Sequence, residues 1–229
     1  MSYIKTLKEI IITYILQYII IFISCLIYKL LGHNNLTNFI NSKCPIILII
    51  FYIITTIYLY NKNKSKETKL SIKNYYPLIL LGISISCFLN MIIFKITKPT
   101  PVTNTINPII LIISSGIIGP IYEEILFRYI NLNKLKQFNT EKKSIIINTL
   151  IFALIHISPT KIFFAFILGL ILNITYTRTN NIKAPIIIHI SSNLIALLLN
   201  QYNSFILFLS IIGVILSYDI LKILNKKEL

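Results

Sequence analysis

The sequence predicts an all-α, polytopic integral membrane protein, built as a bundle of about eight transmembrane helices. Hydrophobic residues make up 55% of the 229 residues, and the mean hydropathy is +0.78. Long apolar runs recur along the whole chain, as in proteins that cross a bilayer several times. The three cysteines (Cys25, Cys44 and Cys87) show no paired spacing and are expected to be packing residues. No repeat or linker is visible, so we predict a single transmembrane domain over residues 1–229.

Eight apolar runs are expected to form the spans. The first three fill residues 7–94, and the region from about 108 to 200 carries three pairs of polar residues. No small-residue cleavage site follows the first run, so we expect a retained span and not a signal peptide. Several runs fall short of the roughly 20 residues of a full span, so the fifth and seventh are expected to extend into their flanks or to lie tilted. The expected spans are Leu7–Leu31, Pro45–Tyr60, Pro77–Phe94, Pro108–Ile130, Ser144–Ile157, Lys161–Tyr176, Pro185–Leu199 and Ser204–Leu224.

The positive charge predicts the orientation of these spans. The chain has 22 lysines and arginines against seven acidic residues, a net charge of +15. The basic residues cluster in short loops between apolar runs, which follows the positive-inside rule and argues against binding to nucleic acid. With eight spans, sixteen of them fall on the side of both termini, five fall on the opposite side, and Arg128 lies within a span. We therefore expect both termini to be cytoplasmic. Heavy use of isoleucine, asparagine and lysine is typical of AT-rich coding sequences and suggests a low-GC bacterium as the source. We therefore expect the membrane to be a bacterial cell membrane.

Two carboxylates lie inside the fourth span. Glu123 and Glu124 are the acidic residues expected in hydrocarbon, whereas the other five lie in or near polar segments or the tails. An ionisable residue there is costly to bury, so its default interpretation is functional. On a helix Glu124 and Arg128 share a face and can form an ion pair. Glu123 is rotated by about 100° from Glu124, so we expect its charge to serve another purpose.

The residues just before the carboxylates predict a distorted helix. Pro120 removes the hydrogen bond to the carbonyl of Gly116, and Gly116 and Gly119 add flexibility. The distortion could serve packing alone, or it could open the helix so that water and substrate reach Glu123.

Two further pairs lie in later spans. Phe152 and His156 are four residues apart in the fifth span, and His189 and Asn193 are four residues apart in the seventh. Each pair therefore shares one helix face. A single histidine in a span is usually a packing residue, but two histidines, an asparagine and a glutamate in three spans need hydrogen-bond partners. We expect these polar side chains to supply them to one another.

The three motifs, in this order, resemble the CPBP family, which comprises the CAAX prenyl endopeptidases and bacterial relatives, bacteriocin-immunity proteins among them. The motifs are Glu-Glu-x-x-x-Arg at 123–128, Phe-x-x-x-His at 152–156 and His-x-x-x-Asn at 189–193. The resemblance covers about residues 109–197, and the first three spans carry no matching motif. It implies an intramembrane, metalloprotease-like glutamic endopeptidase, a peptide-bond hydrolase that uses no metal or other cofactor.

The resemblance also implies a role for each motif residue. Glu123 and His156 would activate the attacking water, and His189 and Asn193 would hydrogen-bond the oxyanion. The supporting residues would be Glu124, Arg128 and Phe152. The chemistry of the residue types agrees, because a carboxylate in a low-dielectric site binds protons more tightly and can act as a general base near neutral pH. Amide and imidazole N–H groups are suitable oxyanion donors.

Residue counts exclude other intramembrane protease chemistries. Asp219 is the only aspartate, so a two-aspartate protease is impossible, and neither a zinc-binding His-Glu-x-x-His motif nor the Gly-x-Ser-Gly setting of a rhomboid serine protease occurs. A zinc site remains open as an alternative, with Glu123, His156 and His189 as the ligands. That arrangement would give Asn193 no role as a ligand.

Two functions outside proteolysis also remain open. A non-catalytic immunity or scaffold protein of the same fold would bind a peptide without cleaving it, although binding alone does not need a water-activating base. A small proton-coupled transporter could use Glu123 and the histidines as a relay, although the chain shows no two-fold repetition. For the protease, the expected partners are a membrane-associated peptide or protein substrate and the lipid bilayer.

Overall fold

The computed structural model describes residues 3–64, 66–97, 106–199 and 201–226, and all regular secondary structure in these ranges is helical. The predicted all-α class is therefore confirmed. Five helices are long and apolar enough to cross a membrane, so the protein is a polytopic helical membrane protein. They are Leu7–Leu30, Cys44–Lys62, Tyr75–Thr97, Pro108–Lys136 and Pro159–Thr179.

Two of the eight expected spans are shorter helices, and a third is described over only part of its apolar length. Helices α8 (Glu141–Leu154) and α10 (Lys183–Ala196) have 14 residues each, which falls short of the roughly 20 needed for a full crossing. In α11 (Ser204–Lys226) the apolar part that the structure describes is Ser204–Ser217. Helix α8 ends at Leu154, and a short turn leads from it to Pro159, the first residue of α9 (Pro159–Thr179). Five of the eight expected spans are therefore full-length apolar helices in the part of the chain that the structure describes.

The described residues group into two compact units. Unit 1 takes its residues from Met1–Lys64 and Val102–Phe138, and unit 2 from Ser65–Pro101 and Asn139–Leu229. The chain thus leaves unit 1 after the first three helices and returns to it for the helix that carries the two carboxylates. Each unit is built from segments that are far apart in the sequence.

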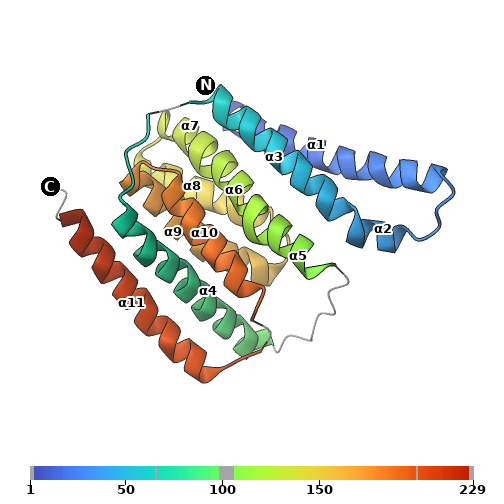
Figure 1. The fold of residues 1–229 in the computed structure, drawn as a ribbon. Coiled ribbons are helices and arrows are strands. Elements are labelled where there is room, and N and C mark those ends of the chain that lie inside the picture. The colour runs from blue at the N-terminus through green and yellow to red at the C-terminus, as the bar shows by residue number, and fades with distance from the viewer. Residues whose placement is uncertain (1–2, 65, 98–105, 200, 227–229) are drawn as a thin grey trace. The chain divides into compact units, whose positions relative to one another are not determined.

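Unit 1 begins with a helical hairpin, in which α1 (Tyr3–Leu30) and α3 (Cys44–Lys62) are joined through the short α2 (Leu36–Ser42). Figure 1 shows the hairpin at the blue end of the chain. The fourth expected span completes the unit as one continuous helix in five parts. These are α5 (Pro108–Leu111), η2 (Ile112–Ile118), α6 (Gly119–Glu124), η3 (Ile125–Leu132) and α7 (Asn133–Lys136).

The start of this long helix follows from its sequence. The side-chain oxygen of Asn107 accepts a hydrogen bond of 2.9 Å from the backbone N–H of Ile109. Pro108 occupies the first helical position, where the N–H that proline lacks has no partner within the helix. The cap and the proline together fix where the helix begins.

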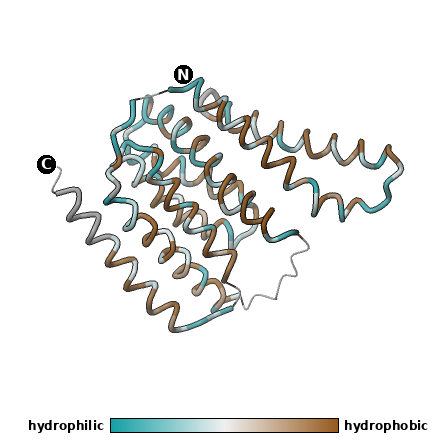
Figure 2. The backbone as a smooth tube through the Cα atoms, in the orientation of Figure 1, coloured by the Kyte–Doolittle hydropathy of each residue, from teal (hydrophilic) through white to brown (hydrophobic). Residues whose placement is uncertain are grey.

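Unit 2 contains the 3₁₀ turn η1 (Ile72–Asn74) and five helices, which include α4 (Tyr75–Thr97) and α9 (Pro159–Thr179) with α8, α10 and α11. Helix α4 packs against both α10 and α11, and α9 packs against α8 and α10. Figure 2 shows that apolar residues dominate the middle of these helices, as expected for a protein in hydrocarbon. The buried core of the unit consists of Leu78, Ile85, Leu89, Leu168, Leu172, Ala184 and Ile188.

Small residues allow α4 to approach its two neighbours closely. A Cβ atom on Gly82 would collide with the carbonyl oxygen of Ile188 in α10, and one on Gly213 of α11 would collide with the hydroxyl of Ser84. Ser86 also donates a hydrogen bond of 2.8 Å to a backbone carbonyl of α10. Close contact between small residues and polar bonds across helices are the usual means of helix association in a bilayer.

Candidate active site

The helix that carries the carboxylates is distorted on both sides of α6. The segments η2 and η3 are π-helical, and π-helical turns occur frequently at functional sites. At the end of η2 the backbone N–H of Gly119 donates to the carbonyl of Ser114, five residues earlier. A Cβ atom on Gly119 would lie 2.9 Å from that oxygen, so the turn requires a glycine. The predicted distortion is therefore present, and it takes the form of a widened helix.

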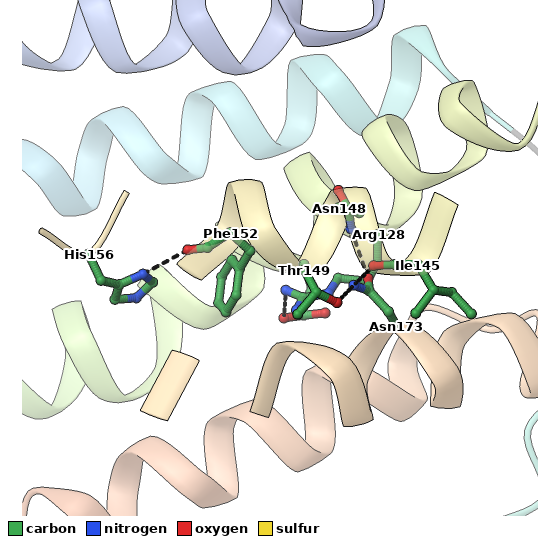
Figure 3. Close-up of polar contacts among 8 residues, drawn as sticks. Arg128, Ile145, Asn148, Thr149, Phe152, His156 and Asn173 are labelled. Atoms are coloured by element: carbon green, nitrogen blue, oxygen red, sulfur yellow. Dashed lines mark hydrogen bonds and ion pairs between the residues drawn. The ribbon is translucent and has the colours of Figure 1, made fainter. Parts of the chain in front are cut away.

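Glu124 and Arg128 form a closed ion pair within this helix. The Nη1 atom of Arg128 donates to Oε1 of Glu124 at 2.8 Å, and both side chains have 0% of their surface exposed. The pairing expected from their spacing is therefore confirmed. Arg128 is labelled and drawn as sticks in Figure 3. Because each charge compensates the other, the pair can stay in a site that would otherwise reject either group.

Glu123 is half-buried next to this pair, and its surroundings in unit 1 come from the N-terminal helices. Its charge interacts with Tyr14 of α1, with Tyr52 of α3 and with its neighbour Tyr122. None of the site residues that the motifs predict lies in the first three spans. The tyrosines inside these apolar runs were the available signal, because a polar group in a span must find a partner.

In unit 2, Phe152 lies between the two histidines of the motifs. Its ring meets the His156 ring edge-on, with 5.1 Å between centroids, and meets the His189 ring in the same manner at 6.0 Å. Phe152 is 1% exposed, so its position is fixed by the packing around it. The phenyl ring therefore sets the positions of two imidazoles that come from different helices.

His156 lies in the turn that follows α8 and not on the helix, which corrects the expected end of the fifth span at Ile157. The helix ends at Leu154, and Ile157 has a positive φ of 60°. His156 keeps its relation to Phe152, because its Nδ1 atom lies 2.9 Å from the Phe152 carbonyl oxygen (Figure 3). A carbonyl can only accept, so Nδ1 carries the hydrogen, and in the neutral ring Nε2 is the atom that can take up a proton.

His189 and Asn193 lie on α10, one turn apart. His189 is buried, with 3% of its surface exposed, and Asn193 is half-buried. The expectation that these residues share a helix holds, because α10 runs without interruption past both of them. Their N–H groups are therefore presented along one face of the helix.

A buried amide network, which none of the three motifs predicts, supports the Phe152 helix. Asn148 donates to the side-chain oxygen of Asn173 at 2.8 Å, and Asn173 donates to the hydroxyl of Thr149 at 2.8 Å (Figure 3). All three side chains are 0% exposed. The network joins α8 to α9.

The motif residues thus divide between the units. Glu123, Glu124 and Arg128 belong to unit 1, and Phe152, His156, His189 and Asn193 belong to unit 2. Their meeting at one catalytic centre stays a prediction. Among the residues that the structure describes, no group of three histidine, cysteine, aspartate or glutamate side chains could hold a metal ion.

Comparison with known proteins identifies one family. The family model described as type II CAAX prenyl endopeptidase Rce1-like matches residues 105–195, which contain all three motifs. No curated protein and no solved structure matches the chain.

Proposed function

We propose that the protein is an intramembrane endopeptidase, because residues 105–195 match the family model of the Rce1-like type II CAAX prenyl endopeptidases. Its substrate is a membrane-associated peptide or protein. The observation that carries the proposal is that the matched region includes Glu123, both motif histidines and Asn193, each in an intact motif. A non-catalytic relative would not need to keep all of these groups.

In the proposed reaction Glu123 acts as the general base. The carboxylate takes a proton from a water molecule while the water oxygen attacks the carbonyl carbon of the scissile peptide bond. His156 accepts a hydrogen bond from the same water through Nε2, which the Nδ1 contact with Phe152 makes available. The C–N bond then breaks, and the proton held by Glu123 passes to the departing amine. The proposal requires the two units to present Glu123 and His156 to one water molecule.

His189 and Asn193 are proposed to stabilise the tetrahedral intermediate. The negative charge on the substrate oxygen would accept hydrogen bonds from an imidazole N–H and an amide N–H. Both donors lie on α10, whose packing against α4 and α9 fixes its position. Preorganised donors of this kind lower a barrier because they do not have to reorient as the charge develops.

The other motif residues are proposed to hold the reacting groups in place. The Glu124–Arg128 pair anchors the helix turn next to Glu123 through a bond that is closed to solvent. Phe152 positions both imidazoles, and the Asn148–Asn173 network fixes the helix that carries Phe152. These residues act through others and do not touch the substrate.

We further propose that the chain crosses a bacterial cell membrane an even number of times, with both termini in the cytoplasm. The sixteen-to-five distribution of lysine and arginine supports this orientation.

The proposal is tested by comparing the peptides released in membranes that contain the wild type or the Glu123→Gln variant. We expect specific fragments of small membrane proteins or peptides only with the wild type. A fragment found in this way would then be synthesised as an intact substrate and given to purified protein in lipid nanodiscs. Identical fragment patterns for the two proteins, at equal abundance, would contradict the proposed activity.

A further inference from the structure

Unit 1 contains a row of polar side chains between helices that are otherwise apolar. On α1 they recur at positions 13, 14 and 17, which is one face of the helix, and on α3 they stand at positions 52 and 56, one turn apart. The opposite faces of the two helices carry exposed isoleucines, such as Ile15 at 52% and Ile54 at 62% exposure. We name the row the polar seam and define it as Thr13, Tyr14, Gln17, Tyr52, Thr56 and Tyr122.

One end of the polar seam lies at Glu123. The rings of Tyr52 and Tyr122 are stacked, with 4.5 Å between their centroids. Tyr52 also lies beside Gln17, and both Tyr14 and Tyr52 interact with the Glu123 charge. Helix α3 packs against both α1 and α6 within one unit. The seam therefore reaches the carboxylate that the mechanism uses as its base.

The other end of the polar seam lies at a cluster of charges. Glu9 of α1 accepts from Lys62 of α3 at 3.2 Å and lies 3.7 Å from the amine of Lys134 on α7. The two lysine side chains are 48% and 26% exposed, so this end is open to solvent. Glu9 and Gln17 are eight residues apart, about 12 Å along the helix. Thr13 stands halfway between them.

Three buried polar atoms of the seam have no hydrogen-bond partner in the described part of the chain. They are Oε1 of Gln17, Oγ1 of Thr56 and the hydroxyl oxygen of Tyr122. Tyr122 is only 1% exposed, and Thr13 lies near its hydroxyl without a well-formed hydrogen bond. A buried polar atom is costly unless it is bonded, and ordered water is the usual partner where no protein group serves. A water molecule suits all three atoms, because it can donate to the amide oxygen and accept from the hydroxyls.

We propose that the polar seam binds water and conducts it from the Glu9 cluster to Glu123. The seam is lined by neutral hydroxyl and amide groups, which hydrogen-bond water without favouring an ion of either sign. A catalytic role for the water of the seam rests on the proposed function, since hydrolysis consumes one water molecule for each peptide bond. The binding of water in the seam does not depend on that function.

The seam is tested by cysteine labelling, which needs no enzymatic activity. Single cysteines are placed at Gln17→Cys and Thr56→Cys after the three native cysteines are replaced by alanine. The proteins are purified in lipid nanodiscs, where both membrane faces are open, and treated with a charged, lipid-impermeant methanethiosulfonate. We expect both cysteines to react about tenfold or more faster than cysteines on the lipid face, because the reacting thiolate forms readily only where water is present.

The matched controls are Ile15→Cys and Ile54→Cys, which lie two residues from the test positions at nearly the same depth but face outward. Monodisperse elution of each variant from a sizing column shows that the variant is folded. If one of the two seam variants misfolds, fast labelling of the other is sufficient to support the proposal. Reaction at positions 17 and 56 as slow as at the two lipid-facing controls would overturn the proposal, whatever the activity of the protein.

A second measurement connects the seam to catalysis. Gln17→Leu removes the amide while keeping similar volume, and we expect it to lower kcat by roughly tenfold with KM unchanged, because water supply and not substrate binding is affected. Unchanged kcat would show that the water of the seam does not serve Glu123. If the labelling result holds but even the wild type cleaves no substrate, the proposed function fails and the water-filled seam remains.

Discussion

Arg128 donates a hydrogen bond of 2.8 Å to Glu124, one helical turn earlier, and neither side chain has any exposed surface. The two residues therefore form a neutral unit inside the helix, although each is ionised. The surroundings of Glu123 differ from those of this pair. Its side chain is half-buried, and it lies near tyrosines of two other helices. Adjacent glutamates in one turn of helix thus have separate surroundings, and separate consequences follow from changing them.

Replacing one partner of the buried pair should destabilise the protein strongly. Glu124→Ala leaves the guanidinium of Arg128 buried without its carboxylate, at a cost of about 3–5 kcal/mol. We expect lower abundance and a lower melting temperature in detergent. The double variant Glu124→Leu/Arg128→Met should recover much of the loss, since it removes both charges. Glu141→Ala, an exposed position, serves as the control, and an effect of Glu124→Ala no larger than this control would argue against a structural pair.

Replacing Glu123 should abolish cleavage and leave the fold intact. The carboxamide in Glu123→Gln keeps the shape of the side chain but cannot take a proton from water. We expect wild-type abundance and melting temperature, together with loss of all measurable hydrolysis of the identified substrate. Activity that survives in Glu123→Gln but disappears in a folded Glu124→Gln variant would transfer the role of base to Glu124.

Zinc chemistry and glutamate chemistry differ in their response to metal removal. A glutamate site should keep its activity in a strong chelator, whereas a zinc site would lose it and regain it on adding metal. Purified protein should contain less than about one zinc per ten chains, because an occupied structural or catalytic site approaches one for one. Near-stoichiometric zinc with activity that depends on it would establish the alternative.

The amide of Asn193 provides an independent test of the same question. Asn193→Ala should slow cleavage by roughly 100-fold or more, the usual effect of losing one oxyanion donor. Its melting temperature should stay close to that of the wild type, because Asn193 is half-buried. Full activity of Asn193→Ala would remove the proposed oxyanion hole, with or without metal.

The sequence predicts contacts between residues that are close in the chain better than contacts between different helices. The pairing of Glu124 with Arg128 follows from a spacing of four residues, which is a local property of any helix. The hydrogen bond between Asn148 and Asn173 joins two helices, and no spacing along the chain indicates which partner each amide will meet. Hydropathy likewise does not predict that α8 ends before His156, because it averages over a window and does not locate a turn. The contribution of Tyr52 to the surroundings of Glu123 likewise depends on tertiary packing.

The division of unit 1 into two separate stretches of chain has a consequence for its synthesis. The helix that carries Lys134 emerges only after the 74 residues from Ser65 to Phe138 have been added, which takes about 4–15 s at roughly 5–20 residues per second. During that interval the hairpin of α1 and α3 is complete, yet Glu9 has only Lys62 as its partner and Tyr52 has no Tyr122 to stack on. The polar face of the first three helices is therefore uncovered in the membrane during this interval. A nascent chain that stops between residues 65 and 107 would keep that face uncovered and would be a substrate for membrane quality-control proteases.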